Sequence, residues 1–214
     1  MSVTIAEELL LLAHDEEKGR PLINSMQLDP ALAGAILAEL AINDRVELSE
    51  KKLTVKDRTP LGDDELDATL ERIVADGKDR KPTWWVQKLQ SHKLRHRLLE
   101  RLADSGVLTE ERGKVLGIFP TRRWPESHPG VEADIRERVS AVLAGADPDA
   151  RTAVLIAITQ AAGLTRKIFP GASKQRVKEI TEGAWAADAV AQTIAAINAA
   201  AIITASTVAV VASS

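Results

Sequence analysis

The residues with the clearest chemical potential are the basic side chains between Lys78 and Arg101. These 24 residues contain eight Lys and Arg against two acidic residues, a net charge of +6, whereas the whole chain carries −3. Guanidinium and ammonium groups on one helix face bind phosphate oxygens through charge-assisted hydrogen bonds. The segment therefore predicts an anion-binding surface. A plain solvated helix face is the alternative, because charged residues of this kind are mostly exposed.

Within this stretch, the side chains expected to bind phosphate lie beside a leucine face. At 100° per residue, Leu94, Leu98 and Leu102 share one side of a helix, and basic residues gather next to them. Trp84 and Trp85 precede them; adjacent helical residues point about 100° apart, which predicts one indole in the core and one partly exposed. The candidate phosphate ligands are His92, Lys93, Arg95 and Arg97.

A second candidate surface is the apolar segment that precedes Arg122 and Arg123. Its alternation of apolar and polar residues predicts a β-hairpin with a long tip. An apolar tip flanked by arginines suits a membrane interface, a neighbouring subunit or the protein's own core. The candidate membrane or oligomer contacts are Val115, Leu116, Ile118, Phe119 and Trp124.

The sequence lacks the residues and motifs that several classes of chemistry require. The chain has no cysteine, which excludes disulfides, thiol nucleophiles and cysteine-based zinc sites. There is no Gly-rich phosphate loop, HExxH or GxSxG motif. Residue types that bind metals occur in two places. The run from His14 to Glu17 is typical of a solvated loop. The pair His92 and His96 lies among cations, which repel a metal ion. We predict no catalytic residue, no metal site and no cofactor, and hence no enzyme.

The elements that position these residues are mostly helices. Thr4 and Glu7 form a capping box that starts the first helix, and Gly77 closes a helix that begins near Asp63. Residues 78–106 predict one helix or two in succession. Val46–Val55 predicts a first hairpin, and Asp147 with Pro148 predicts the start of a later helix. Because a helix followed by a hairpin occurs twice, a winged-helix-like nucleic-acid-binding protein is the alternative function.

The C-terminal segment is rich in alanine. Thirteen of the chain's 33 alanines fall within residues 184–214, where Asp188 is the one charged residue. A buried central helix is the expected role, with a partner- or lipid-facing segment and a transmembrane helix as alternatives. The fold class we predict is mainly α: a single globular helical domain over residues 1–214, with a central hydrophobic C-terminal helix and two β-hairpins.

An ordered set of motifs resembles the Golgi phosphoprotein 3 family. The set comprises EELLLLAHDEEKG, LAGAILAELAINDRVEL, KLRHRLLERLADSGVLTEE and IFPTRRWP, followed by the alanine-rich segment, and it covers nearly the whole chain. The resemblance implies a mostly helical domain. It also implies a peripheral membrane adaptor like the eukaryotic members, which bind phosphatidylinositol 4-phosphate in a basic pocket and the tails of glycosyltransferases. The family's hydrophobic hairpin, linked to membrane contact and oligomerisation, matches Gly113–Pro125. The composition suggests a bacterial, actinobacterial member.

The family's lipid-binding residues transfer only in part. Two basic residues three apart match His92 and Arg95, whereas the family's Trp and Arg positions fall on Asn24 and Ala33. The expected function is therefore a non-enzymatic, cytoplasmic, peripheral membrane adaptor that binds anionic phospholipid headgroups. Its expected partners are an anionic membrane surface, protein tails and a second copy of the chain bound through the 113–125 hairpin; nucleic acid is the less favoured partner.

Overall fold

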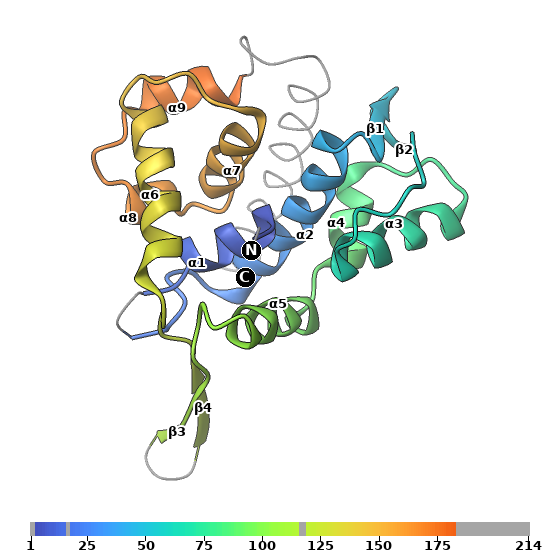
Figure 1. Ribbon diagram of the computed structural model, residues 1–214. Helices are drawn as coiled ribbons and strands as arrows, with labels where there is room; N and C mark the ends of the chain where they lie inside the picture. The colour runs from blue at the N-terminus through green and yellow to red at the C-terminus, as the bar shows by residue number, and fades with distance from the viewer. Residues whose placement is uncertain (1–2, 16–17, 116–118, 183–214) are drawn as a thin grey trace, which may run out of the picture.

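The computed structural model describes residues 3–15, 18–115 and 119–182, and this part of the chain is mainly helical, as predicted (Figure 1). The two predicted hairpins are present as separate two-stranded antiparallel sheets. That the chain forms one domain stays a prediction. The helices are α1 (Ile5–Leu12), α2 (Ser25–Ile42), α3 (Asp64–Asp76), α4 (Pro82–Leu89), α5 (His92–Asp104), α6 (Pro129–Leu143), α7 (Ala150–Ala161), α8 (Thr165–Ile168) and α9 (Lys174–Thr181). The strands are β1 (Val46–Ser49), β2 (Lys52–Val55), β3 (Glu111–Val115) and β4 (Phe119–Arg123).

Helix α2 occupies the centre of the described fold. It packs against α1, α3, α4, α5 and α7, and Figure 1 shows it between the α6–α9 group and the α3, α4, β1, β2 group. Every residue from Leu32 to Ala41 is buried, so α2 is enclosed on all sides instead of burying one apolar stripe, and Glu39 is the one charged residue in this stretch. Its length and composition would also suit a membrane span, but this packing makes it a core helix.

The start of the fold is fixed by the predicted capping box. The Thr4 hydroxyl accepts a hydrogen bond from the Glu7 backbone N–H at 3.3 Å, and the Glu7 carboxylate accepts one from the Thr4 N–H at 2.7 Å. These two bonds satisfy backbone donors that would otherwise be unpaired at the helix N-terminus. Helix α1 itself is buried along its whole length between α2, α5, α6 and α7.

Residues 78–106 form two helices, because the chain turns at Gln90 and restarts at Ser91. The Ser91 hydroxyl caps α5 by accepting from the Leu94 N–H at 3.1 Å. In α4 the prediction for the paired tryptophans is confirmed: Trp85 is 2% exposed, and Trp84 lies at the surface of the core. Their rings meet edge to face at 4.8 Å between centroids, and the Arg80 guanidinium covers Trp84 at 4.6 Å.

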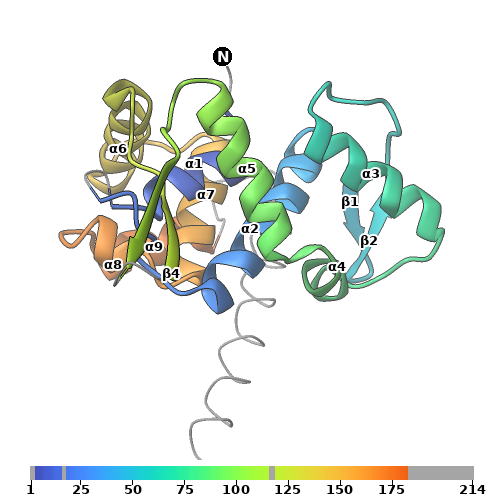
Figure 2. The same ribbon diagram turned by 90° about the horizontal axis from the view of Figure 1, so that it is seen from below.

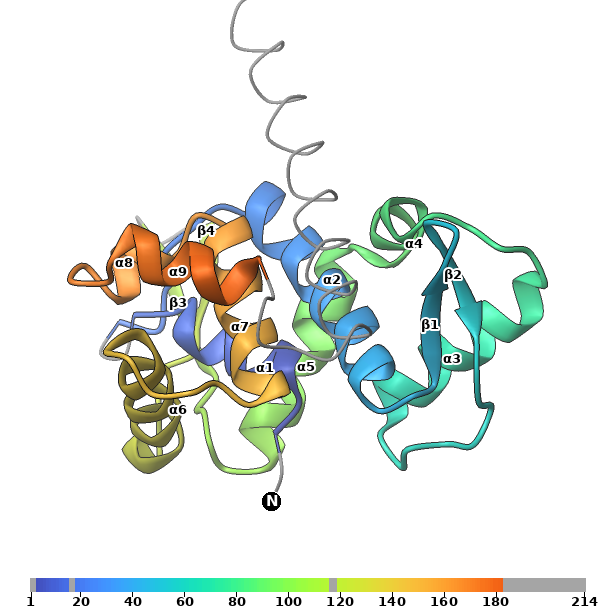
Figure 3. The same cartoon turned by 90° about the horizontal axis from the view of Figure 1, so that it is seen from above.

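Helices α6 to α9 pack together on the other side of α2 (Figure 3). The predicted start of α7 is wrong by two residues: Asp149, and not Asp147, is the N-cap, and its carboxylate accepts from the Thr152 N–H at 2.7 Å. Pro148 therefore precedes the cap instead of occupying the first helical position. The alanine-rich segment lies outside the described residues, so its central role stays a prediction.

The second hairpin, β3 and β4, extends away from the helical body (Figure 1). Its register pairs Glu111 with Arg123 at the base and Val115 with Phe119 at the far end. The base is held by the loop after α1, where the Gly19 carbonyl accepts from the Trp124 N–H at 3.0 Å. Gly19 adopts φ +57°, and a Cβ there would lie 2.4 Å from the Pro125 nitrogen, so this close approach requires glycine.

Candidate functional site

Helix α5 carries the four predicted phosphate ligands and presents them on two different flanks. Its buried leucines face α1 and α2, and Figure 2 shows α5 crossing the body beside the second hairpin. Arg95 and Arg97 are two residues apart, which places them about 200° apart around the helix axis. The structure therefore separates these two arginines, while His92 and Lys93 are exposed near the N-terminus of α5.

Arg95 reaches across to α2. Its Nη1 donates to Oδ1 of Asp29 at 2.6 Å, and both side chains are largely shielded from solvent. Burial raises the pKa of Asp29, and the nearby Arg95 and His92 partly oppose that shift. Burial also lowers the pKa of His14, a shift opposed by its hydrogen bond to the Leu10 carbonyl and reinforced by Arg95. Arg95 is thus a semi-buried cation with one carboxylate partner.

Arg97 and Arg101 serve to attach α5 to its neighbours. Arg97 donates two hydrogen bonds to the Glu65 carboxylate of α3, the one from Nη2 at 2.9 Å. Arg101 bonds Glu7 of α1 and Asp63, the N-cap of α3, both at 2.7 Å. Both guanidiniums are engaged by acids within the fold. Arg97 therefore holds a structural position on the flank away from Arg95, and it is not part of one cluster with it.

On the Arg95 flank, His96 meets the base of the second hairpin. The Arg122 guanidinium of β4 donates to Nε2 of His96, and because arginine only donates, this nitrogen is an unprotonated acceptor. Glu100 lies 3.6 Å from the same nitrogen, and Glu110 lies 3.4 Å from Nε of Arg122. We call the cluster formed by His92, Arg95, His96 and Arg122 the basic face.

Trp124 corrects one expectation. We predicted it as part of an apolar contact surface, but it is 6% exposed and packs edge to face against His96, with 5.8 Å between ring centroids. It therefore anchors the hairpin to α5. Val115 and Phe119 pair along the backbone at the far end of the hairpin. Leu116 and Ile118 lie outside the described residues, so the contact role of these four residues stays a prediction.

The two positions at which the sequence departs from the family pattern have clear structural roles. Asn24 is the N-cap of α2, and its side-chain oxygen accepts from the Gln27 N–H at 3.1 Å. Ala33 is 0% exposed inside the core, where an arginine would have to be buried. The tryptophan and the arginine that the resemblance implies at these positions are therefore replaced by a helix cap and a buried alanine.

Three residues of the site were not predicted from the sequence. Asp29 lies 66 positions from Arg95, and no local pattern connects them. Arg122 was noted as a flank of the apolar tip, not as a partner of His96. Met26, in the first turn of α2, is 62% exposed and is the large apolar side chain most open to solvent among the described residues. Its spacing of three from Asp29 places both on one side of α2.

The described part of the chain holds no group of three or more His, Asp or Glu side chains arranged to bind a metal ion. His92 and His96 remain a pair on one helix, and His96 is occupied by Arg122. The arginines of the basic face are donors, and they suit oxygen atoms of an anion.

Comparison with known proteins identifies the family of the chain. The family model described as Golgi phosphoprotein 3 (GPP34) matches residues 5–197. Vacuolar protein sorting-associated protein 74 from Eremothecium gossypii is 28% identical over 169 residues, which cover 66% of this chain and 49% of that protein. The chain thus spans about half the length of this curated relative.

Proposed function

Because the chain belongs to the Golgi phosphoprotein 3 family, we propose that it is a non-enzymatic protein of the membrane surface whose basic face binds anionic phospholipid headgroups. The names of the family and of the relative, which refer to the Golgi and to vacuolar sorting, point to membrane trafficking. The observation that carries the proposal is the position of Arg95 and His92. These residues match the family's two basic positions, and they lie beside His96 and the arginine contributed by the second hairpin.

The geometry supports binding by exchange of partners. A phosphate oxygen would replace Asp29 as the acceptor for Arg95 and His96 as the acceptor for Arg122. Electrostatic attraction to an anionic membrane amounts to roughly 1 kcal/mol per basic residue, so a few such residues give weak, reversible binding.

Met26 adds an apolar contact to this surface. An exposed methionine gains free energy when it leaves water, about 1.5–3 kcal/mol for full burial. It lies in the first turn of α2, three residues before Asp29, the partner of Arg95, and two residues after Asn24, where the resemblance implies a tryptophan. We propose that Met26 enters the membrane interface while the basic face holds the headgroups.

The other partners follow from the same proposal. We propose that the hairpin tip around Val115 and Phe119 contacts the membrane or a second copy of the chain. The protein is then cytoplasmic and peripherally bound to the membrane. Its remaining surface is presented to protein tails. Nucleic acid is not favoured as the ligand. Arg97 and Arg101 of α5 are paired with Glu65, Glu7 and Asp63, so the helix lacks a free basic stripe to enter a groove.

Vesicle co-sedimentation tests the proposal. Vesicles of phosphatidylcholine alone are compared with vesicles containing phosphatidylserine, phosphatidylinositol or phosphatidylinositol 4-phosphate at matched total charge. We expect binding to anionic vesicles that weakens as salt rises. Arg95→Gln should lower the affinity about fivefold, the worth of one cation near the membrane. Arg72→Gln, an exposed arginine of α3, is the matched control.

Two outcomes would contradict the proposal. The first is the absence of salt-sensitive binding to every anionic vesicle. The second is equal binding by wild type and Arg95→Gln when both are folded, as checked by circular dichroism. A preference for phosphatidylinositol 4-phosphate over equally charged lipids would identify the headgroup, and equal binding to all of them would indicate charge recognition alone.

A further inference from the structure

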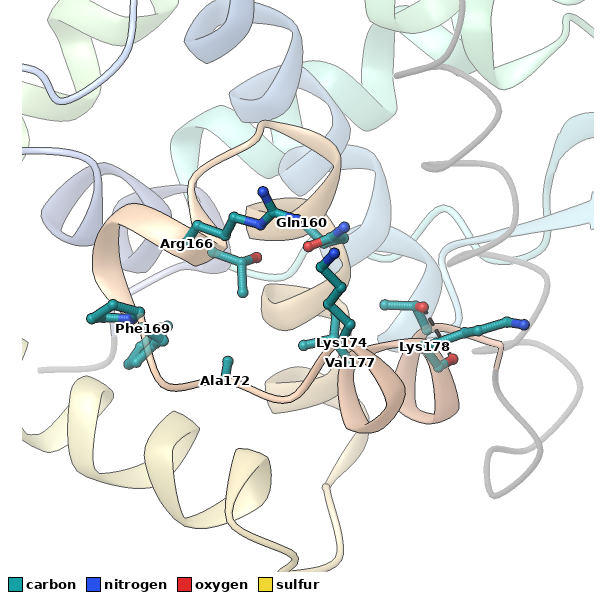
Figure 4. Close-up of a pocket in the computed structure, with 10 residues that line it drawn as sticks. Gln160, Arg166, Phe169, Ala172, Lys174, Val177 and Lys178 are labelled. Carbon is teal, nitrogen blue, oxygen red and sulfur yellow. Dashed lines mark hydrogen bonds between the residues drawn. The ribbon is translucent and has the colours of Figure 1, made fainter.

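A pocket lies between α7, α8 and α9, and none of its described lining residues belongs to the basic face. It has a volume of about 600 Å³, within the range of small-molecule sites. Figure 4 shows it open between the α7 end and the start of α9. Its described lining residues are Gln160, Thr165, Arg166, Phe169, Pro170, Ala172, Lys174, Val177, Lys178 and Thr181.

The charged lining residues of the pocket are all cations. None of its described lining residues is acidic, and three are basic. Lys178 pairs with Glu182 at 3.5 Å, but Arg166 and Lys174 form no ion pair within the described residues. Figure 4 shows the ends of Arg166 and Lys174 turned toward Gln160, whereas Lys178 extends outward. This contrasts with the arginines of α5, each of which has a carboxylate partner.

Two further features indicate the kind of ligand. Thr165 is almost fully buried in the wall, and its hydroxyl oxygen has no hydrogen-bond partner among the described residues. A buried polar group without a partner costs free energy, and a ligand oxygen would supply the missing bond. Phe169, Ala172 and Val177 supply the apolar part of the lining. The pocket thus offers both hydrogen-bond donors and apolar surface.

We propose that this pocket binds a phosphomonoester that carries an apolar group. Arg166 and Lys174 hold the phosphate oxygens, with Thr165 and Gln160 as neutral donors, and the apolar group lies on Phe169 and Val177. This site is independent of the basic face. Two kinds of ligand carry both a phosphomonoester and an apolar group: a soluble phosphomonoester, and a phosphatidic acid, whose headgroup is a phosphomonoester.

Isothermal titration calorimetry of the full chain tests this proposal with three probes: inorganic phosphate, phenyl phosphate and dihexanoyl phosphatidic acid. We expect the two organic probes to bind at least about tenfold more tightly than inorganic phosphate, since they also bury apolar surface. The double variant Arg166→Gln/Lys174→Gln should weaken them by about tenfold or more, because it removes two charge-assisted hydrogen bonds. Arg72→Gln, the exposed arginine of α3, should leave their affinity unchanged.

Thr165→Val provides a second variant that keeps the side chain's shape. It should weaken phenyl phosphate by about fivefold, the worth of one neutral hydrogen bond, while the fold keeps its stability. Tighter binding of phosphatidic acid than of phenyl phosphate would assign the pocket to lipid, and the reverse to a soluble ligand. The proposal is overturned if no organic probe binds, if inorganic phosphate binds equally well, or if the double variant retains full affinity.

Discussion

The Asp29 carboxylate limits how much positive charge the basic face presents. Its contact with Arg95 at 2.6 Å occupies the guanidinium that matches the family's basic position. Sequence spacing was enough to place His92 and Arg95 on one helix, because both lie within a segment of regular period. Asp29 could not be found in that way, since its relation to Arg95 depends on how α2 and α5 cross, and helix crossing is a property of the packed core.

Replacing this carboxylate is therefore expected to strengthen membrane binding. In Asp29→Asn the side chain keeps its size but no longer neutralises Arg95, so affinity for anionic vesicles should rise by about fivefold, equivalent to roughly one charge near the membrane. Co-sedimentation at low salt measures the change. Asp44→Asn is the control, because Asp44 is an exposed acid paired with Lys56 outside the basic face. A lower affinity in Asp29→Asn would mean that Asp29 positions Arg95 instead of competing for it.

The elements of the fold were predictable wherever a local signal starts or ends them. Thr4 with Glu7, Gly77 and the alternating residues of both hairpins all act within a few positions, and each behaves as expected. The start of α7 was misplaced because two aspartates flank Pro148, and both are good caps. The structure selects Asp149, which reaches the Thr152 N–H. Attachment of the second hairpin depends instead on Gly19, which is distant in sequence.

Gly19 offers a test of that attachment. Gly19→Ala places a Cβ 2.4 Å from the Pro125 nitrogen at a φ of +57°, so both a backbone clash and left-handed strain arise. We expect a loss of about 2–5 kcal/mol in the free energy of unfolding, combining the two effects. Gly62→Ala is the matched control: its φ is +81° and its Cβ would meet open space, so it should cost only about 1–2 kcal/mol. Urea denaturation measures both, and equal losses would show that the close approach is unimportant.

At the scale of the whole molecule, the expected helical class is confirmed, and α2 lies at the centre of the described fold. Leu32, Ile36 and Leu40 recur at helical spacing in α2, a pattern typical of a helix with one apolar stripe. In the structure alanines and Gly34 fill the remaining sides, and their small size lets α1, α4 and α7 pack closely. Hydrophobic periodicity alone cannot distinguish a helix with one buried face from a helix buried on all sides when the other faces carry alanine.

A buried network of charges joins the first residues to this core. Arg151 of α7 bonds Glu8 of α1 at 3.1 Å, Glu39 of α2 at 2.6 Å and the carbonyl of Val3. Burial raises the pKa of Glu39, and Arg151 opposes that shift. Because Glu39 also accepts from the Ile5 N–H at 2.6 Å, one arginine connects three helices. The network specifies how α1, α2 and α7 meet, and no single segment of the sequence contains it.

Removing the arginine tests whether this network holds the molecule together. Arg151→Met leaves Glu8 and Glu39 buried with less compensation, and such unpaired charges cost about 3–5 kcal/mol. The pKa of Glu39 should then rise further, so the folded state binds a proton more readily than the unfolded chain. Stability lost at neutral pH should therefore return in part as the pH falls toward the folded-state pKa of Glu39. Urea denaturation across pH measures this. Lys56→Met, which breaks an exposed pair with Asp44, should change stability by less than about 1 kcal/mol at every pH. A pH-independent loss in Arg151→Met would show that the arginine acts through packing alone.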